Sequence, residues 1–334
     1  MNRRQLLWVA YALLSWTICA ETNAQTIKLA TLAPRDSTWF RILEKMGERW
    51  RQASGGRVQL RIFAGTQGDE SNIMRKIRVG QLQAAAVTTV GLGTIDPTTQ
   101  ALHIPLAFRS QEELDYVQSR IQGRMEKALA DKGFVVLNWG ETGWIRFFTK
   151  APVASPEDLK KLKIFVWSTG KSSDDVWKDN GFQPVSLAAT DILPSLKTGM
   201  ISAIQAPPIM ALSNQWFGLA NYMTDLPWAP LTGATIISKA TWEQIPPDLR
   251  PTLATIAKEA GDEMQKEVRS LEQQAISEMV KRGLHVVKVP PEAEREWQKT
   301  VEAIYPRVRG DFVPAAEFDE VMRLRNEYRA SKAK

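Results

Sequence analysis

The stretch Ser155–Pro208, which reads SPEDLKKLKIFVWSTGKSSDDVWKDNGFQPVSLAATDILPSLKTGMISAIQAPP, decides the fold. Short apolar runs at Leu162–Trp167, Pro184–Leu187 and Met200–Gln205 predict three strands, and the amphipathic segments between them predict helices. Strands that alternate with helices form βαβ crossovers, and such crossovers build a parallel sheet. A crevice for a ligand is expected outside the carboxyl ends of these strands.

The rest of the chain repeats this alternation, which predicts an α/β fold. Further strands are expected at Thr26–Leu32, Val58–Phe63, Gly80–Val90, Phe134–Trp139, Leu231–Ser238 and Leu284–Val289. Helices are expected up to Ala53, over Ser71–Val79, from Gln111 to Lys132, over Asp248–Arg282 and over Pro291–Tyr305. The helix from Asp248 would span about 50 Å at a rise of 1.5 Å per residue, which is long enough to brace two domains.

Length and composition indicate a globular protein with more than one domain. The chain has 334 residues, of which 44% are apolar and 24% charged, so it can bury one or two large cores. The net charge of +6 is spread along presumed helix faces. Because no basic cluster is combined with stacking aromatic residues, the pattern argues against a nucleic-acid groove.

The first 24 residues have the three-part pattern of a cleavable secretory signal peptide. Arg3 and Arg4 precede an apolar run over Leu6–Ala20, and small residues stand at the last and third-last positions before a cleavage site expected after Ala24. An uncleaved membrane anchor is the alternative reading. Cys19 is the sole cysteine, so the mature chain would hold no disulfide and no thiolate metal site.

Residues for catalysis or metal binding are scarce. His103 and His285 are the two histidines, and each lies in an apolar context far from the other. The sequence has no HExxH, GxSxG, SxxK or acidic calcium-loop motif. The adjacent carboxylates at Glu157–Asp158 and Asp174–Asp175 are explained as helix caps and dipole partners. The sequence therefore predicts no enzyme, no cofactor and no metal site.

Three segments in the opening stretch carry a family resemblance: SPEDLKKLKI, GFQPV and TDILPSLKTG. Their order and spacing resemble the extracytoplasmic solute-binding proteins of tripartite ATP-independent periplasmic (TRAP) transporters, the dicarboxylate-binding DctP type. The resemblance implies a two-domain periplasmic solute-binding fold with a ligand cleft between the domains and a long bridging helix. It also implies a small-molecule ligand and delivery to the membrane permease subunits of the transporter.

Domain boundaries follow from two turn-like breaks around the central stretch, Glu141–Gly143 and Pro227–Pro230. The first domain is expected to combine residues 25–141 with 231–270. The second is expected to combine residues 142–230 with 271–334. Each domain would then be discontinuous in sequence, and the long helix would cross between them.

The first strand of the opening stretch departs from the resembled family. Most members read close to LKIRVP, where the arginine pairs with an organic acid, but this chain has Phe165 at that position. Ala206 replaces a usual asparagine, and Ala189 stands where relatives often place an aromatic residue. These replacements remove polar anchors from the cleft and favour a hydrophobic or amphipathic ligand. A subset of the family that is found with a tetratricopeptide-repeat partner protein has this character, and this chain resembles it in that respect. The alternative is that Phe165 belongs to the core and that Arg146, in a GxR-like element at the domain crossing, binds a carboxylate.

The candidate ligand-binding residues form an apolar wall with a few polar contacts. Phe165 and Trp167 share one strand face because side chains two apart do so. The other apolar candidates are Trp144, Phe147, Met210, Trp216 and Trp228, and the polar candidates are Arg146, Thr88 and Gln205. Ordinary core packing is the alternative for each large aromatic residue. A secreted enzyme on the same scaffold and a module that senses a ligand for a receptor remain rival functions.

Overall fold

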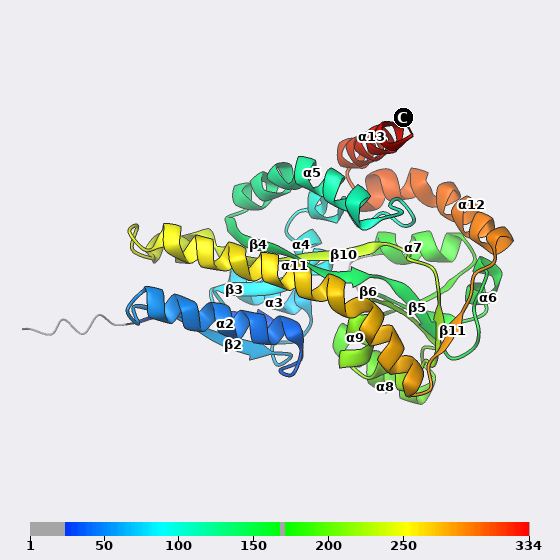
Figure 1. The fold of residues 1–334 in the computed structure, drawn as a ribbon, viewed down its shortest axis with the longest axis horizontal. Helices are drawn as coiled ribbons and strands as arrows, with labels where there is room; N and C mark the ends of the chain where they lie inside the picture. Colours follow the sequence, from blue (N-terminus) through cyan, green and yellow to red (C-terminus); the bar gives the residue numbers. More distant parts are fainter. Residues whose placement is uncertain (1–23, 168–170, 334) are drawn as a thin grey trace, which may run out of the picture.

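The structure, a computed structural model, describes residues 24–167 and 171–333, and it contains two β-sheets covered by helices (Figure 1). The signal peptide expected over residues 1–24 lies, except for its last residue, outside this part of the chain. In spatial order, the first sheet contains β2 (Val58–Ala64), β1 (Gln25–Thr31), β3 (Ala84–Thr88), β10 (Pro230–Ser238) and β4 (Phe134–Trp144). The second contains β11 (His285–Val287), β9 (Tyr222–Thr224), β5 (Arg146–Thr149), β8 (Ala203–Ala206), β6 (Lys163–Trp167) and β7 (Gln183–Leu187). The expected α/β fold is confirmed.

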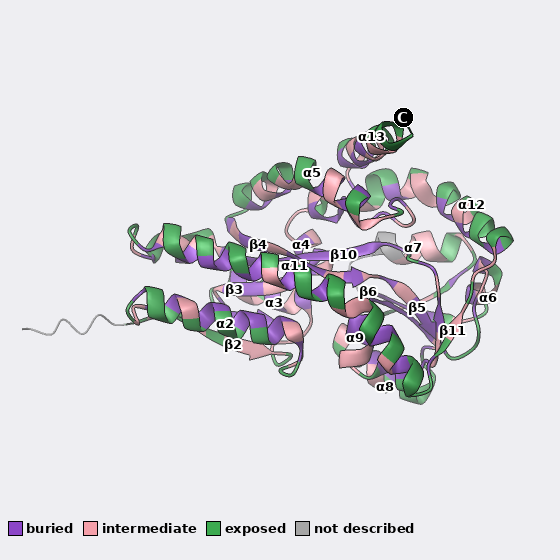
Figure 2. Cartoon of the chain, viewed as in Figure 1, coloured by how far each residue is buried: buried purple, intermediate pink, exposed green. Residues whose placement is uncertain are grey.

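Helices surround both sheets. They are α2 (Thr38–Ala53), α3 (Glu70–Arg78), α4 (Thr89–Gly93), α5 (Gln111–Asp131), α6 (Pro156–Lys160), α7 (Lys171–Asp179), α8 (Ile192–Thr198), α9 (Pro208–Ser213), α10 (Lys239–Gln244), α11 (Arg250–Lys281), α12 (Pro291–Arg307) and α13 (Ala315–Lys332). Three 3-10 helical segments are η1 (Pro97–Gln100), η2 (Ala189–Asp191) and η3 (Trp216–Gly218), and one π-helical segment is η4 (Val308–Phe312). The central strands are buried, whereas the helices expose their outer faces (Figure 2). No helix among the described residues is both long and apolar enough to cross a membrane.

The central βαβ stretch folds as its sequence predicts. Ser155 caps α6 by accepting a hydrogen bond from the backbone of Asp158, which in turn accepts one from the Ser155 backbone. Strand β6 then runs parallel to both β7 and β8. The carboxyl ends of these three strands therefore lie at one edge of the second sheet, where a ligand crevice is expected.

Two antiparallel segments connect the sheets. Strand β4 continues past Trp139 to Trp144, so the turn-like break expected at Glu141–Gly143 is wrong. A bulge takes its place: the pairing with β10 skips Thr142, and Gly143 adopts a φ of +104° that favours glycine. Beyond the bulge, Ile145 exchanges backbone hydrogen bonds with Trp228 and Ala229 of the returning segment, each 2.8 Å long.

Helix α11 is the third connection, close to its expected bounds. Its first part, from Leu253 to Val268, packs with α2 and β4 in the core of the first sheet. Farther along, Ile276 and Met279 belong to the core of the second sheet. This one helix therefore braces both sheets, as Figure 1 shows.

The last helix, α13, was not expected from the sequence. It packs against α5 through a cluster that includes Phe318, Val321 and Leu324. The expected boundaries place residues 315–332 in the second domain. This helix contacts α5, which is expected in the first domain, and also η4 and Tyr305, which are expected in the second. The boundaries stay a prediction.

Substitution of Gly261 tests how closely α11 approaches β4, and substitution of Gly123 in α5 is the control. A Cβ built on Gly261 of α11 would lie 2.6 Å from Cβ of Asn138 and 2.8 Å from the carbonyl oxygen of Trp139. Gly261→Ala is therefore expected to lower the free energy of unfolding by about 1–3 kcal/mol. Gly123→Ala in α5, where nothing lies within 4 Å, is expected to raise it by about 0.5–1 kcal/mol. Urea denaturation of both variants is the measurement, and changes of the same sign would contradict the close approach.

Candidate ligand-binding site

A cavity of 430 Å³ lies between the two sheets. From the first sheet it is lined by the ends of β1 and β3, by the β4 bulge and by the first turns of α2. From the second it is lined by Trp167 at the end of β6 and by residues of η2, α9 and η3. The cavity therefore lies at strand carboxyl ends, where the βαβ pattern places a ligand.

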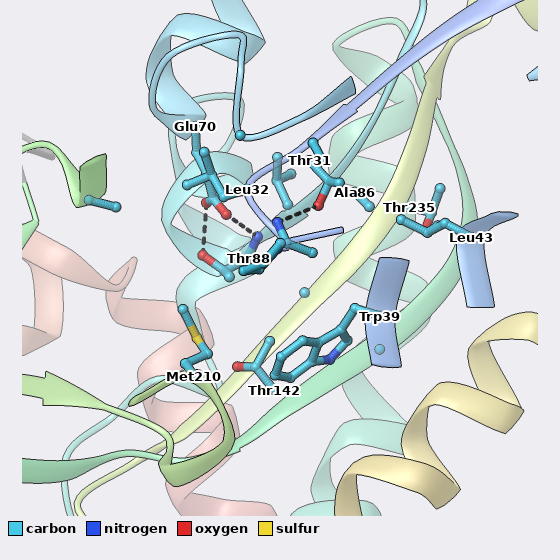
Figure 3. A pocket seen from close by; sticks show the side chains of 18 of the residues that line it. Thr31, Leu32, Trp39, Leu43, Glu70, Ala86, Thr88, Thr142, Met210 and Thr235 are labelled. Atoms are coloured by element: carbon cyan, nitrogen blue, oxygen red, sulfur yellow. Dashed lines mark hydrogen bonds between the residues drawn. The ribbon is translucent and has the colours of Figure 1, made fainter. Parts of the chain in front are cut away.

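Large apolar side chains form much of its wall. They come from both sides of the cavity and are Trp39, Leu43, Trp167, Met210, Trp216 and Met264. Figure 3 shows Trp39 and Met210 reaching toward the same space from different elements. The indole nitrogen of Trp39 donates a hydrogen bond of 3.2 Å to the carbonyl of Glu141, which fixes this ring beside the β4 bulge.

The lining that the structure describes includes three charged side chains, and none of them is an enclosed cation. They are Arg35, Glu70 and Glu141. Arg35 is exposed, so it lies at the rim. Glu141 is paired with Arg269 of α11, with oxygen and nitrogen 2.5 Å apart, and also accepts hydrogen bonds from Gln265 and Gln111.

Glu70 is a buried carboxylate that serves as a fixed part of the wall. Its oxygens accept hydrogen bonds from the backbone and hydroxyl of Thr88, both 2.8 Å (Figure 3), and from the backbone of Gly91 at 2.7 Å. Burial raises the pKa of Glu70, and these bonds oppose the rise. Because Glu70 holds Thr88, it sets where that threonine faces the cavity.

A second cavity of 90 Å³ lies farther along the space between the sheets. Its lining includes Gln205 of β8, Trp228 of the returning segment, and residues of α12 and η4. His103 also lines it, and Nδ1 of this histidine lies 3.3 Å from the carbonyl oxygen of Pro230. Burial lowers the pKa of His103 to about 4, although the bond to Pro230 acts in the opposite direction.

This lowered pKa predicts an acid-dependent loss of stability. The pKa of His103 is about 4 in the folded state and 6.5 for the free side chain, so between these values the unfolded state binds more protons. Stability should therefore fall as the pH drops from 6.5 toward 4, by up to about 3 kcal/mol at 1.36 kcal/mol per pKa unit. Denaturant unfolding at pH 7 and pH 4.5 should show a larger loss for the wild type than for His103→Gln. An equal loss in both proteins would contradict the assignment.

The ten predicted site residues fall into three groups. Thr88, Trp167, Met210 and Trp216 line the large cavity. Gln205 and Trp228 line the second cavity, which Trp167 also borders. Arg146, Phe165, Trp144 and Phe147 line neither cavity.

Arg146 connects the domain crossing to α11. Its Nη1 lies 2.5 Å from a carboxylate oxygen of Glu272, and the two side chains are only 12% and 18% exposed. Its Nε finds no hydrogen-bond partner in the part of the chain that the structure describes. The arginine is therefore already neutralised, and a ligand carboxylate would have to displace Glu272 to reach it.

The three remaining aromatic residues belong to cores. Phe165 is fully buried, with its ring 4.9 Å from that of Trp167, and Phe147 stacks on Trp297 at 5.4 Å. Trp144 packs with the cluster between α5 and α13 and donates a hydrogen bond to Gln111. Phe165 was expected at the cleft from the family resemblance, and Trp167 beside it from the shared strand face. The structure instead buries Phe165 in the core of the second sheet, while Trp167 packs against that core and borders the cavity.

Several lining residues were not identified from the sequence. The principal ones are Trp39, Glu70, Asn138, Thr142, Asn214 and Met264. Glu70 begins α3 directly after a turn that contains Gly65 and Gly68, and no local pattern marks such a residue as lining a cavity. Trp39 and Met264 lie on amphipathic helices, where a residue that faces a cavity has the same spacing as one that faces a core. Among the described residues, no group of three or more His, Cys, Asp or Glu side chains is placed to hold a metal ion.

Residues 29–311 match the family described as "Bacterial extracellular solute-binding protein, family 7" (DctP). A solute-binding protein of Chromohalobacter salexigens is 25% identical over 79% of this chain and 78% of its own. The 2,3-diketo-L-gulonate-binding periplasmic protein YiaO of Escherichia coli is 24% identical over 79% and 81%. A solved TRAP periplasmic solute-binding protein of Sulfurospirillum deleyianum with bound succinate aligns with a TM-score of 0.82, at 20% identity, over 90% of this chain and 98% of that one. The structural likeness shows a shared fold.

Proposed function

The chain belongs to the bacterial extracellular solute-binding proteins of family 7, and from this membership we propose that it is the periplasmic binding protein of a TRAP transporter. The resemblance found in the sequence is confirmed at the level of the family. A member of this family is a solute-binding protein and not an enzyme. Closure of the two sheets around a ligand, followed by delivery to the permease subunits, is the proposed mechanism.

The proposal includes export. The arginines and apolar run of residues 1–24 support a cleavable signal peptide, and YiaO is a periplasmic protein by name. A ligand-sensing role in the same compartment is the alternative. Association with a tetratricopeptide-repeat partner is a further proposal that rests on the loss of the family arginine at Phe165.

The proposed ligand is a small amphipathic molecule with a large apolar surface. One observation carries this choice: the lining that the structure describes holds no enclosed cation that could pair with a ligand carboxylate. Its one described cation, Arg35, lies at the exposed rim. A carboxylate buried without such a partner would keep its desolvation cost, several kcal/mol. Each 100 Å² of apolar ligand surface that enters the cavity would instead gain about 2.5 kcal/mol.

An ordinary organic acid is the second candidate, because relatives of this chain bind such molecules. They include YiaO with 2,3-diketo-L-gulonate, a C4-dicarboxylate-binding protein of Vibrio cholerae and the S. deleyianum protein with succinate. For this chain the acid would have to pair with Arg35 or displace Glu272 from Arg146.

Ligand capture separates the two candidates. The mature protein would be purified without added ligand, examined by native mass spectrometry and then titrated calorimetrically with succinate, D-glucuronate and straight-chain monocarboxylates of six to twelve carbons. The proposal expects a co-purified amphipathic molecule and an affinity that rises with chain length. Tight binding of succinate or D-glucuronate, abolished by Arg146→Ala or Arg35→Ala, would establish the organic-acid function instead.

A further inference from the structure

Trp167 lines both cavities described above and also a third, smaller one. The 430 Å³ cavity and a 10 Å³ cavity share Trp167, Glu70 and Ala189. The 10 Å³ cavity and the 90 Å³ cavity share Trp167 and Val90. All three spaces therefore border the Trp167 side chain, and the 10 Å³ cavity shares further lining residues with each of the other two.

The 90 Å³ cavity differs chemically from the large one. Among the side chains that the structure describes, those of residues 24–167 and 174–333, no Asp, Glu, Lys or Arg belongs to its lining. Aromatic rings supply much of its wall, from Trp177, Trp228 and Phe312. Its polar groups are neutral and come from Thr89, Gln100, His103 and Gln205. At about 10–15 Å³ for each enclosed water, its volume suffices for several atoms of a ligand.

His103 gives this cavity a defined hydrogen-bonding character. The carbonyl of Pro230 can only accept a hydrogen bond, so Nδ1 of His103 must carry the proton in their contact. The other nitrogen, Nε2, is then an acceptor, because burial keeps the ring neutral at physiological pH. A ligand group that meets Nε2 must therefore be a hydrogen-bond donor.

We propose that the ligand chamber has two compartments, and that the cavity behind Trp167 binds an uncharged, hydrogen-bond-donating end of the ligand, such as a hydroxyl or primary amide. The apolar body of the ligand lies in the large cavity. The inference rests on the proposed function and specifies its ligand: an elongated molecule with a neutral polar terminus. A terminal carboxylate is disfavoured there, because it would meet the Nε2 lone pair and no cation among the described lining side chains.

Three matched series of probes test this proposal. They are straight-chain monocarboxylates, ω-hydroxy acids and α,ω-dicarboxylates of equal length, from six to twelve carbons, so that each set differs only at the far end. Calorimetric titration of the mature wild-type protein should rank hydroxyl above methyl above carboxylate. The hydroxy acid is expected to bind at least tenfold more tightly than the dicarboxylate, but only beyond a threshold length, because shorter members end in the large cavity.

Histidine resonances report where the far end lies. The chain has two histidines, so ¹⁵N-histidine labelling gives a simple spectrum with exposed His285 as an internal control. Hydroxy acids beyond the threshold length should shift the Nε2 resonance of His103 and leave His285 unchanged. Equal affinities for all three end groups, with no response of His103, would overturn the two-compartment proposal while leaving the amphipathic ligand intact. Binding of short dicarboxylates alone would instead overturn the proposed ligand class, and binding of no probe would overturn both.

Variants distinguish a contact with the ligand from a structural role. Gln205→Leu and His103→Phe should each lower the affinity for hydroxy acids above the threshold length by at least tenfold. The affinity for shorter members should not change. Gln244→Leu, at an exposed site on α10, is the matched control and should change nothing. An equal loss of affinity at every chain length would mean that these residues only support the fold. If His103→Phe does not fold, Gln205→Leu alone decides the question.

Discussion

Phe165→Arg is expected to lower the free energy of unfolding by at least about 4 kcal/mol, because it places a guanidinium group in an apolar core. Phe165 is fully buried among side chains such as Phe148 and Ile204, and its ring lies edge-on to Trp167. This substitution restores the arginine of the resembled family, so a test of binding alone would mistake unfolding for lost affinity. Chemical denaturation followed by circular dichroism is the measurement.

Phe165→Leu is the control, since it keeps the site apolar and should cost only about 1–2 kcal/mol. A Phe165→Arg protein with wild-type stability and a new affinity for succinate would contradict the core placement. It would show that residue 165 faces the ligand, as the family resemblance implies.

Arg146→Ala is expected to lower the free energy of unfolding by about 3–5 kcal/mol, because it leaves Glu272 as an unpaired, largely buried charge. The two side chains are 12% and 18% exposed, and they join β5 to α11 beside the domain crossing. Glu272→Ala should cost a similar amount. The double variant Arg146→Met/Glu272→Leu should recover most of the loss, since replacing both charges by apolar groups removes the unpaired ion.

A second ion pair on α11 provides the matched control. Lys45 and Glu263 are 2.9 Å apart but 59% and 37% exposed, so Lys45→Ala should change stability by less than about 1 kcal/mol. If Arg146→Ala costs no more than Lys45→Ala, the Arg146–Glu272 pair does not brace the crossing. Arg146 would then be available to a ligand carboxylate.

Most of the fold was predictable from the sequence because local patterns specify it. The strands of the central stretch alternate with helices within short segments, and α11 carries a long helical pattern between a proline pair and a glycine. The β4 bulge was misread as a turn because Thr142–Gly143 looks the same in both settings without its partner strand. Helix α13 was missed although Phe318, Val321 and Leu324 form an apolar stripe.

The site was less predictable, because cavity and core use the same side chains. Trp167 and Phe165 lie on one strand face, yet Trp167 borders three of the cavities described above and Phe165 borders none of those three. The difference depends on the packing of segments distant in sequence, which no local pattern records. The same holds for Arg146, whose partner Glu272 lies 126 positions away.

The most direct test of the proposed function is a crystal structure of the protein with its co-purified ligand. We predict ligand density in the 430 Å³ cavity, with its apolar body against Trp39, Met210 and Trp216 and with Arg146 still paired to Glu272. A ligand carboxylate within 4 Å of the Arg146 guanidinium, with Glu272 displaced, would contradict the account and establish an ordinary organic-acid binding protein.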